Sequence, residues 1–155
     1  VRVWRDQKFI SIPNLINPQS FSSIEFNGKI YLAVITDEIE GTIHHGDIHI
    51  FESSTGAELN FKELQKLSLH VPTNVKFSKA PSGDLLLYVL TRNEPRAFYV
   101  FSYAGGSNFI PSIGEDTIIK KASNLDVIQI DGNTEMASIV SGDNLYIIQA
   151  VINQF

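Results

Sequence analysis

The chain has 155 residues, of which 43% are hydrophobic, a length and composition typical of one globular domain with a sizeable core. Its formal net charge is −5 and its Lys and Arg residues are scattered, which argues against a phosphate-binding surface and excludes nucleic acid as an expected partner. Because the chain has no cysteine, disulfides, thiolate metal sites and a cysteine nucleophile are excluded as well.

The N-terminus begins at Val1 and shows no basic region followed by an apolar segment, so no signal peptide is expected within the chain. No apolar run approaches the roughly 18 residues of a membrane span. A start without Met leads us to expect a processed product or a piece of a longer protein.

The first strand signal along the chain after residue 20 is a hairpin. Two apolar runs, Phe21–Phe26 and Ile30–Thr36, flank the pair Asn27 and Gly28. Both turn residues tolerate the positive φ of a type I′ turn, so the pattern predicts a two-stranded hairpin. Two more strands are expected at Asp47–Glu52 and Phe61–Leu69. A helical turn around Glu58–Gln65 is the alternative to a loop that leads into the last of these.

The same pattern recurs downstream. Further strands are expected at Asn74–Ser78, Asp84–Thr91, Arg96–Tyr103, Asn108–Lys120, Leu125–Ile130, Thr134–Val140 and Leu145–Ile152. Apolar strand centres end at residues 4, 51, 101 and 148, and a second turn pair, Asp131-Gly132, follows the first by two periods. These markers share one repeat length of about fifty residues.

Four short strands in each period are typical of β-propeller blades, which need neighbours to bury their faces. The run Leu85–Leu90 is apolar on both faces, as expected of a strand between packed sheets. We therefore predict an all-β chain of about three propeller blades, each with four antiparallel strands. The alternative is a β-sandwich of about a dozen strands.

Several segments carry a family resemblance. The run Phe26–Val34, followed by a strand that ends in an aromatic residue and then a Phe-led strand, resembles the EAR (EPTP, epitempin) repeat. Val3–Ile10 looks like the end of such a repeat, and Ile128–Gly132 and Leu145–Gln149 are similar to it more weakly. Ser78–Gly83 departs from the tight turn of the pattern. The resemblance implies a propeller from secreted proteins, such as the leucine-rich glioma-inactivated family, that binds other proteins and has no known catalysis.

The repeat boundaries divide the chain into the end of one blade (1–17), two blades (18–70 and 71–121) and the start of another (122–155). The two end parts together would duplicate one strand, so they cannot close a single blade. We therefore expect another protein chain, either the rest of a cleaved precursor or a second copy, to complete the propeller.

Candidate metal and catalytic groups are sparse. His45 and His49 could bind one zinc ion, with His44 and the nearby acids Asp37, Glu38, Glu40 and Asp47 as possible further ligands. Asp37, Glu38 and Glu40 could bind calcium, but neither the spacing of an EF-hand nor that of an established zinc site is present, and a solvated polar loop is favoured. There is no Gly-x-Ser-x-Gly elbow and no phosphate loop, so no cofactor and no enzyme activity are expected.

Surface recognition remains the leading functional prediction. The candidate contact residues lie in three predicted loops and are Glu38, Glu40, His44, His45, Arg92, Glu94, Arg96, Tyr103 and Asn108. Arg and Tyr are frequent in binding hot spots, and Pro95 would stiffen its loop. We thus predict a non-catalytic, extracellular protein-interaction module, with a carbohydrate-binding propeller as the alternative and a hydrolase as a third hypothesis.

Overall fold

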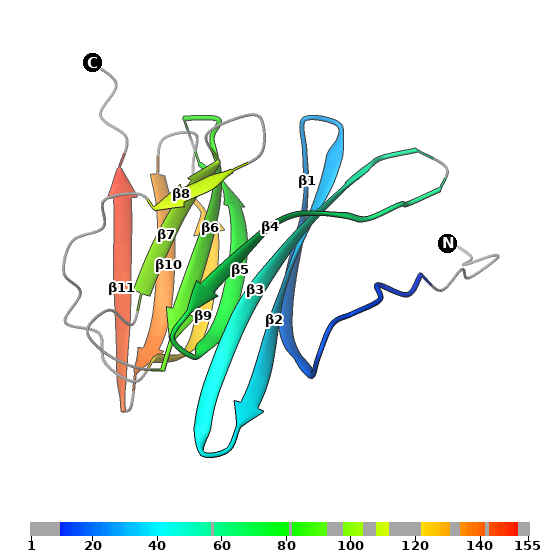
Figure 1. Ribbon diagram of the computed structural model, residues 1–155. Helices are drawn as coiled ribbons and strands as arrows, with labels where there is room; N and C mark the ends of the chain where they lie inside the picture. Colours follow the sequence, from blue (N-terminus) through cyan, green and yellow to red (C-terminus); the bar gives the residue numbers. More distant parts are fainter. Residues whose placement is uncertain are drawn as a thin grey trace, which may run out of the picture.

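The computed structural model describes residues 10–56, 58–80, 82–92, 98–103, 108–111, 122–130, 134–141 and 143–151. Within these ranges the chain forms eleven β-strands and no helix (Figure 1), so no helix that could cross a membrane is found there. The strands are β1 (Pro18–Phe26), β2 (Lys29–Glu40), β3 (Ile43–Ser54), β4 (Lys62–Leu69), β5 (Pro72–Lys79), β6 (Leu85–Thr91), β7 (Phe98–Tyr103), β8 (Phe109–Pro111), β9 (Ala122–Gln129), β10 (Thr134–Ser141) and β11 (Asn144–Val151). The prediction of an all-β chain is confirmed.

The strands form three antiparallel sheets in which neighbours along the chain are also neighbours in space. Sheet A has the order β1-β2-β3-β4, sheet B the order β5-β6-β7-β8, and sheet C the order β11-β10-β9. Short connections between antiparallel strands favour this meander arrangement. The described strands thus build three sheets, whereas the alternative β-sandwich would have two.

The turn between β1 and β2 has the geometry that its sequence predicts. Asn27 and Gly28 have φ angles of 50° and 72°, and Phe26 pairs directly with Lys29 across the turn. Positive φ at both central residues is the mark of a type I′ turn, whose twist matches that of the flanking strands. The second predicted turn, Asp131-Gly132, lies outside the described residues.

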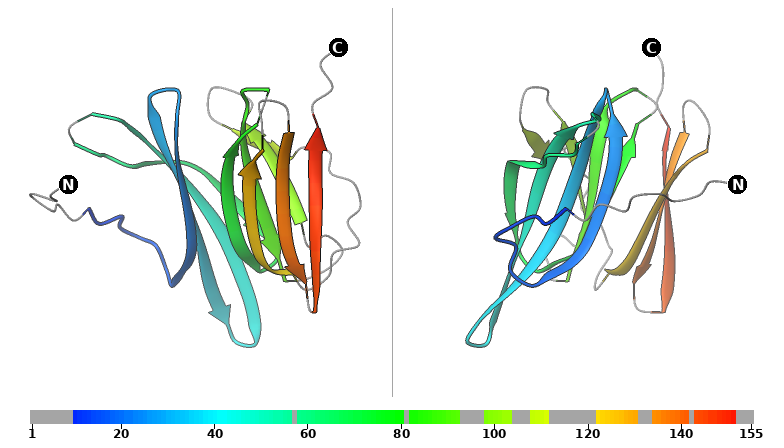
Figure 2. Two further views of the ribbon diagram at one scale, coloured as in Figure 1. Left: turned by 180° about the vertical axis from the view of Figure 1, so that it is seen from behind. Right: turned by 90° about the vertical axis from the view of Figure 1, so that its right-hand side faces the viewer.

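The three sheets pack face to face, with sheet B between the other two (Figure 2). Their first strands lie side by side, β1 against β5 and β5 against β9. Strand β6 shows why sheet B packs on both sides: Leu85, Leu87 and Val89 belong to the core shared with sheet A, whereas Tyr88 and Leu90 belong to the core shared with sheet C. The expectation that Leu85–Leu90 lies between packed sheets is therefore confirmed.

Polar contacts connect neighbouring sheets at their edges. The backbone N–H of Phe77 on β5 donates to the hydroxyl of Ser22 on β1 over 3.0 Å. On the far side of the same interface, the Gln65 side chain on β4 bonds both backbone groups of Phe109 on β8. An ion pair of 3.5 Å between Lys76 and Asp126 joins β5 to β9. Each interface between sheets therefore has a polar link beside its apolar core.

Strand limits differ from the prediction in a few places. The expected strand Asn108–Lys120 is described only as the short β8, because residues 112–121 lie outside the described part of the chain. Residues 1–9, expected to hold strands of a preceding repeat, lie outside it as well. The described residues 10–17 contain no strand, since Pro13 is followed by Asn14 with a φ of 66° in a turn. Strand β4 begins at Lys62, so the Glu58–Gln65 segment contains no helical turn among its described residues.

Candidate functional site

The predicted loop at Glu38–His45 is instead the end of the long β2–β3 hairpin, and this expectation is corrected. Strand pairing continues to Glu40 and Ile43, so only Gly41 and Thr42 form the turn. Gly41 has a φ of 66°, a left-handed conformation that glycine adopts without strain. Backbone pairing therefore extends the hairpin through a polar segment that lacks the apolar alternation of a typical strand.

The end of this hairpin carries four of the predicted contact residues (Figure 1). Glu38 pairs with His45, and Ile39 pairs with His44 by backbone register. Ile39 and Ile43 are both exposed on the hairpin, as are Glu38 and Glu40. The four residues Glu38, Glu40, His44 and His45 thus lie together on one projecting element.

Arg92 lies close to the segment of β3 at which the projecting end of the same hairpin begins. Its backbone N–H donates to the carbonyl of Val71 over 3.0 Å. Pro72, which follows Val71 in the chain, lies directly against Gly46 on β3, where the end of the hairpin begins. The structure therefore brings Arg92 to the same end of the molecule as the hairpin. Two further predicted contact residues, Glu94 and Arg96, lie outside the described residues.

Tyr103 and Asn108 lie at the opposite end, near the β1–β2 turn. The ring of Tyr103 lies 5.1 Å from that of Phe109 and 5.6 Å from that of Tyr31, between sheets A and B. Burial, together with a hydrogen bond to Tyr103, raises the pKa of Tyr31. Tyr103 is thus half-buried core, whereas Asn108 is exposed. The structure does not bring these two residues together with the hairpin.

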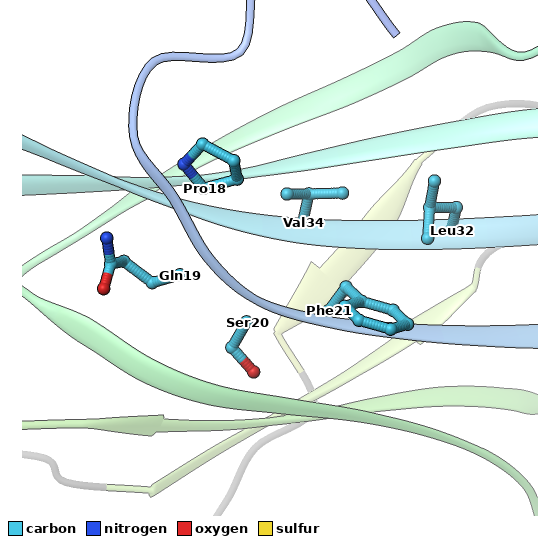
Figure 3. A pocket seen from close by; sticks show the side chains of 6 residues that line it. All are labelled: Pro18, Gln19, Ser20, Phe21, Leu32 and Val34. Atoms are coloured by element: carbon cyan, nitrogen blue, oxygen red, sulfur yellow. The ribbon is translucent and has the colours of Figure 1, made fainter. Parts of the chain in front are cut away.

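The face of sheet A that points away from sheet B, here called the open face of sheet A, is apolar over β1, β2 and β3. Strand register places Phe21, Val34 and His49 in one row, and Leu32 beside Phe51 in the next. Val34 and Phe51 are buried, yet they belong to neither core between the sheets. An open depression of about 490 Å³ lies at the β1 side of this face (Figure 3). Its lining residues are Pro18, Gln19, Ser20, Phe21, Leu32 and Val34.

Charged groups on the same face, over β3 and β4, are paired with one another. Asp47 accepts from Lys66 over 2.6 Å and from the Ser68 hydroxyl over 2.7 Å, and His49 lies 3.4 Å from Glu63. Burial raises the pKa of Asp47, but the hydrogen bonds from Lys66 and Ser68 outweigh it and hold that pKa below its usual range. The bond to Asp47 likewise raises the pKa of Lys66. The apolar region thus has a polar rim in which Asp47 and Lys66 form an ion pair.

The face of sheet C that points away from sheet B, here called the open face of sheet C, is also apolar. Register places Val140 beside Leu145 and Ser138 beside Ile147. Leu145, Ile147 and Ile128 are all exposed there. The stack of sheets therefore ends in an apolar surface on each side.

The strand geometry corrects the zinc hypothesis. His45 and His49 both lie in β3, four residues apart, which in an extended strand is a separation of about 13 Å. They cannot bind one ion together. Across the part of the chain that the structure describes, no group of three or more His, Cys, Asp or Glu side chains lies where it could hold a metal ion.

The sequence predicts that an incomplete propeller leaves apolar blade faces at both ends for another chain to cover, but it does not tell which residues lie on them. Phe21, Leu145 and Ile147 sit in apolar strand runs, a pattern that by itself predicts core packing. No protein-family model matches the chain, and no curated protein matches its sequence. The candidate site is therefore defined by its geometry: two apolar faces and one projecting hairpin.

Proposed function

We propose that sheets A, B and C are consecutive blades of a β-propeller and that the chain is a non-catalytic protein-interaction module, whose two open faces bind another protein chain. Each complete sheet is a four-stranded meander, and the first strands lie side by side, as the innermost strands of blades do. The resemblance to EAR repeats supports the same fold, and an extracellular location rests on that resemblance alone.

Strand register carries the proposal, because it makes positions in the three sheets comparable. The repeat identified in the sequence places residues 51, 101 and 148 at the same position of the third strand of each sheet. Residues 49, 99 and 146, two positions earlier, are therefore also equivalent, and each pairs across its sheet with one residue of the second strand and, through it, one of the first. The rows are His49, Val34 and Phe21 in sheet A, Tyr99, Val89 and Val75 in sheet B, and Tyr146, Ile139 and Leu125 in sheet C. Phe21, Val75 and Leu125 are therefore equivalent.

These equivalent residues differ sharply in burial. Val75 is 5% exposed and Leu125 is 8% exposed, because each packs against the preceding sheet. Phe21, which among the described residues has no preceding sheet, is 72% exposed. Burying one large apolar side chain contributes about 1.5–3 kcal/mol, so a partner sheet on this face would be strongly favoured.

The opposite faces show the same relation. The row one residue earlier on the third strand pairs Ile35 with Ile48 in sheet A, and both are fully buried by sheet B. Its equivalent in sheet C pairs Val140 with Leu145, which is 64% exposed. Among the described residues, both open faces are thus blade faces without a neighbour, and apolar patches of this kind mark protein interfaces.

The carbohydrate alternative is less well supported. A sugar site needs an exposed aromatic platform at the same position of each repeat. The recurring aromatic residues Phe51 and Phe101 are instead buried within their sheets. Their position favours packing between sheets over contact with a sugar.

The experiment that tests the proposal asks whether the chain associates with protein. Light scattering gives the mass in solution, and mass spectrometry of the same sample identifies every polypeptide present. Hydroxyl-radical footprinting then compares Phe21 and Leu145 with exposed Ile110, which lies on neither open face. We expect protection of Phe21 or Leu145 in an associated species, with Ile110 unchanged. A stable monomer without a bound chain, reactive at both faces, contradicts the proposal.

A further inference from the structure

We infer that the open face of sheet A binds the open face of sheet C of a second copy of the chain. The inference rests on the proposed function and deepens it, because it names the partner. The two interfaces between sheets inside the molecule show which kind of surface packs on a face of this kind.

Both internal interfaces are formed in the same way. The face of sheet A that carries Ile48 and Ile50 covers sheet B, and the face of sheet B that carries Tyr88 and Leu90 covers sheet C. We call the face that a sheet turns toward the next sheet along the chain its forward face, and the opposite face its backward face. In each case, the forward face of one sheet packs on the backward face of the next. The open face of sheet A is a backward face, so the surface that fits it is a forward face.

The open face of sheet C is such a forward face. By register, Leu145 and Ile147 of β11 are equivalent to Ile48 and Ile50 of β3. Ile48 and Ile50 are fully buried against sheet B, whereas Leu145 and Ile147 are 64% and 59% exposed. The interface of sheet C with the second copy would thus continue the packing that sheets A and B already show.

Polar groups on the first strands continue the same pattern. Ser22 on β1 accepts from the Phe77 N–H on β5, and the equivalent Lys76 on β5 pairs with Asp126 on β9. Asp126 holds the position in sheet C that Ser22 holds in sheet A and Lys76 holds in sheet B, and its side chain remains largely exposed. The β1 strand of a second copy would offer it the exposed hydroxyl of Ser23, which lies on the open face of sheet A.

The Asp47–Lys66 ion pair on the open face of sheet A does not oppose this contact. Asp47 is paired with Lys66 and bonded by Ser68, so an apolar partner covering β1 and β2 would leave no unmatched charge at that ion pair. The three described sheets of each of two copies supply six sheets, within the roughly four to eight blades of known propellers. Because two different faces meet, the contact is heterologous, and it closes a ring when the rotation allows.

Complementation between two variants tests the contact. Phe21→Asp disables the open face of sheet A, and Ile147→Asp disables the open face of sheet C; both residues are exposed, so each chain should still fold. Circular dichroism and thermal unfolding verify folding. Exposed Ile110→Asp on β8, which lies on neither open face, is the matched control. The readout is the mass by sedimentation equilibrium, starting from 17.3 kDa for one chain.

We expect the unmodified chain and the Ile110→Asp control to associate, and each face variant alone to be monomeric. An equimolar mixture of Phe21→Asp and Ile147→Asp should regain a one-to-one complex, because each variant retains the face that the other has lost. This complex should bind more weakly than the unmodified pair, since it has one contact instead of two.

Two outcomes overturn the inference while leaving the proposed function intact. One is self-association that only one of the two variants abolishes and that mixing does not restore, which indicates a contact between identical faces. The other is association only with a different polypeptide. A chain that stays monomeric without any partner overturns both the inference and the proposed function.

Discussion

Replacing Gln65 with alanine removes the polar link between the outer strands of sheets A and B. The Gln65 side-chain amide accepts from the Phe109 N–H over 2.6 Å and donates to the Phe109 carbonyl over 3.1 Å. It therefore occupies the place that a neighbouring strand would take beside β8. Each hydrogen bond contributes about 1 kcal/mol net, so we expect the free energy of unfolding to fall by about 2 kcal/mol.

Urea unfolding measures this change, and hydrogen exchange of the Phe109 amide locates it. We expect that amide to exchange about 30-fold faster in Gln65→Ala, because a loss of about 2 kcal/mol makes local opening at Phe109 more frequent by that factor. Gln65→Glu is the matched control, because its carboxylate still accepts from the Phe109 N–H but cannot donate to the carbonyl. It should lose about 1 kcal/mol at neutral pH. A change below about 0.5 kcal/mol in Gln65→Ala, with unaltered exchange at Phe109, would refute the reasoning.

Three further substitutions test local features. Gly28→Ala places a β-carbon at a φ of 72° and should cost about 1–2 kcal/mol in thermal unfolding; no loss would argue against the type I′ turn. Gly46→Ala directs a methyl group into the ring of Pro72 and should cost about 1–3 kcal/mol in urea, whereas a neutral effect would mean that the sheets separate easily. Burial raises the pKa of Asp47, but its hydrogen bonds lower that pKa by more, so the folded pKa lies below the unfolded one. The stabilisation by ionised Asp47 is therefore present above about pH 4 and disappears as the pH falls through the folded pKa. Asp47→Asn should therefore flatten the acid dependence of unfolding, and an unchanged dependence would exclude Asp47 as its source.

The strands themselves could be predicted because their signals are local. Asn27 and Gly28 specify a turn through the φ angles that they tolerate, and the alternation on either side specifies two paired strands. The double-sided apolar run Leu85–Leu90 correctly indicated a strand between two sheets. These properties depend on a few neighbouring residues, so the amino-acid order is sufficient to reveal them.

The hairpin end could not be predicted in the same way. Residues 37–46 contain acids, histidines and glycines, a composition typical of a loop. In the structure Glu38 and His45 are paired strand residues, because backbone hydrogen bonding between β2 and β3 does not require apolar side chains. The same extended geometry separates His45 from His49 and removes the zinc hypothesis, which sequence spacing had left open.

The sequence alone determined an all-β chain and the sites of most of its strands, whereas strand register in the structure places Phe21, Val75 and Leu125 in comparable rows. Only the tertiary structure decided that Val75 and Leu125 are covered while Phe21 is exposed. The physical reason is that alternation fixes which face of a strand is apolar, whereas burial depends on whether another sheet packs there. Two apolar faces with the same local pattern thus differ in burial because, among the described residues, one has a neighbouring sheet and the other has none.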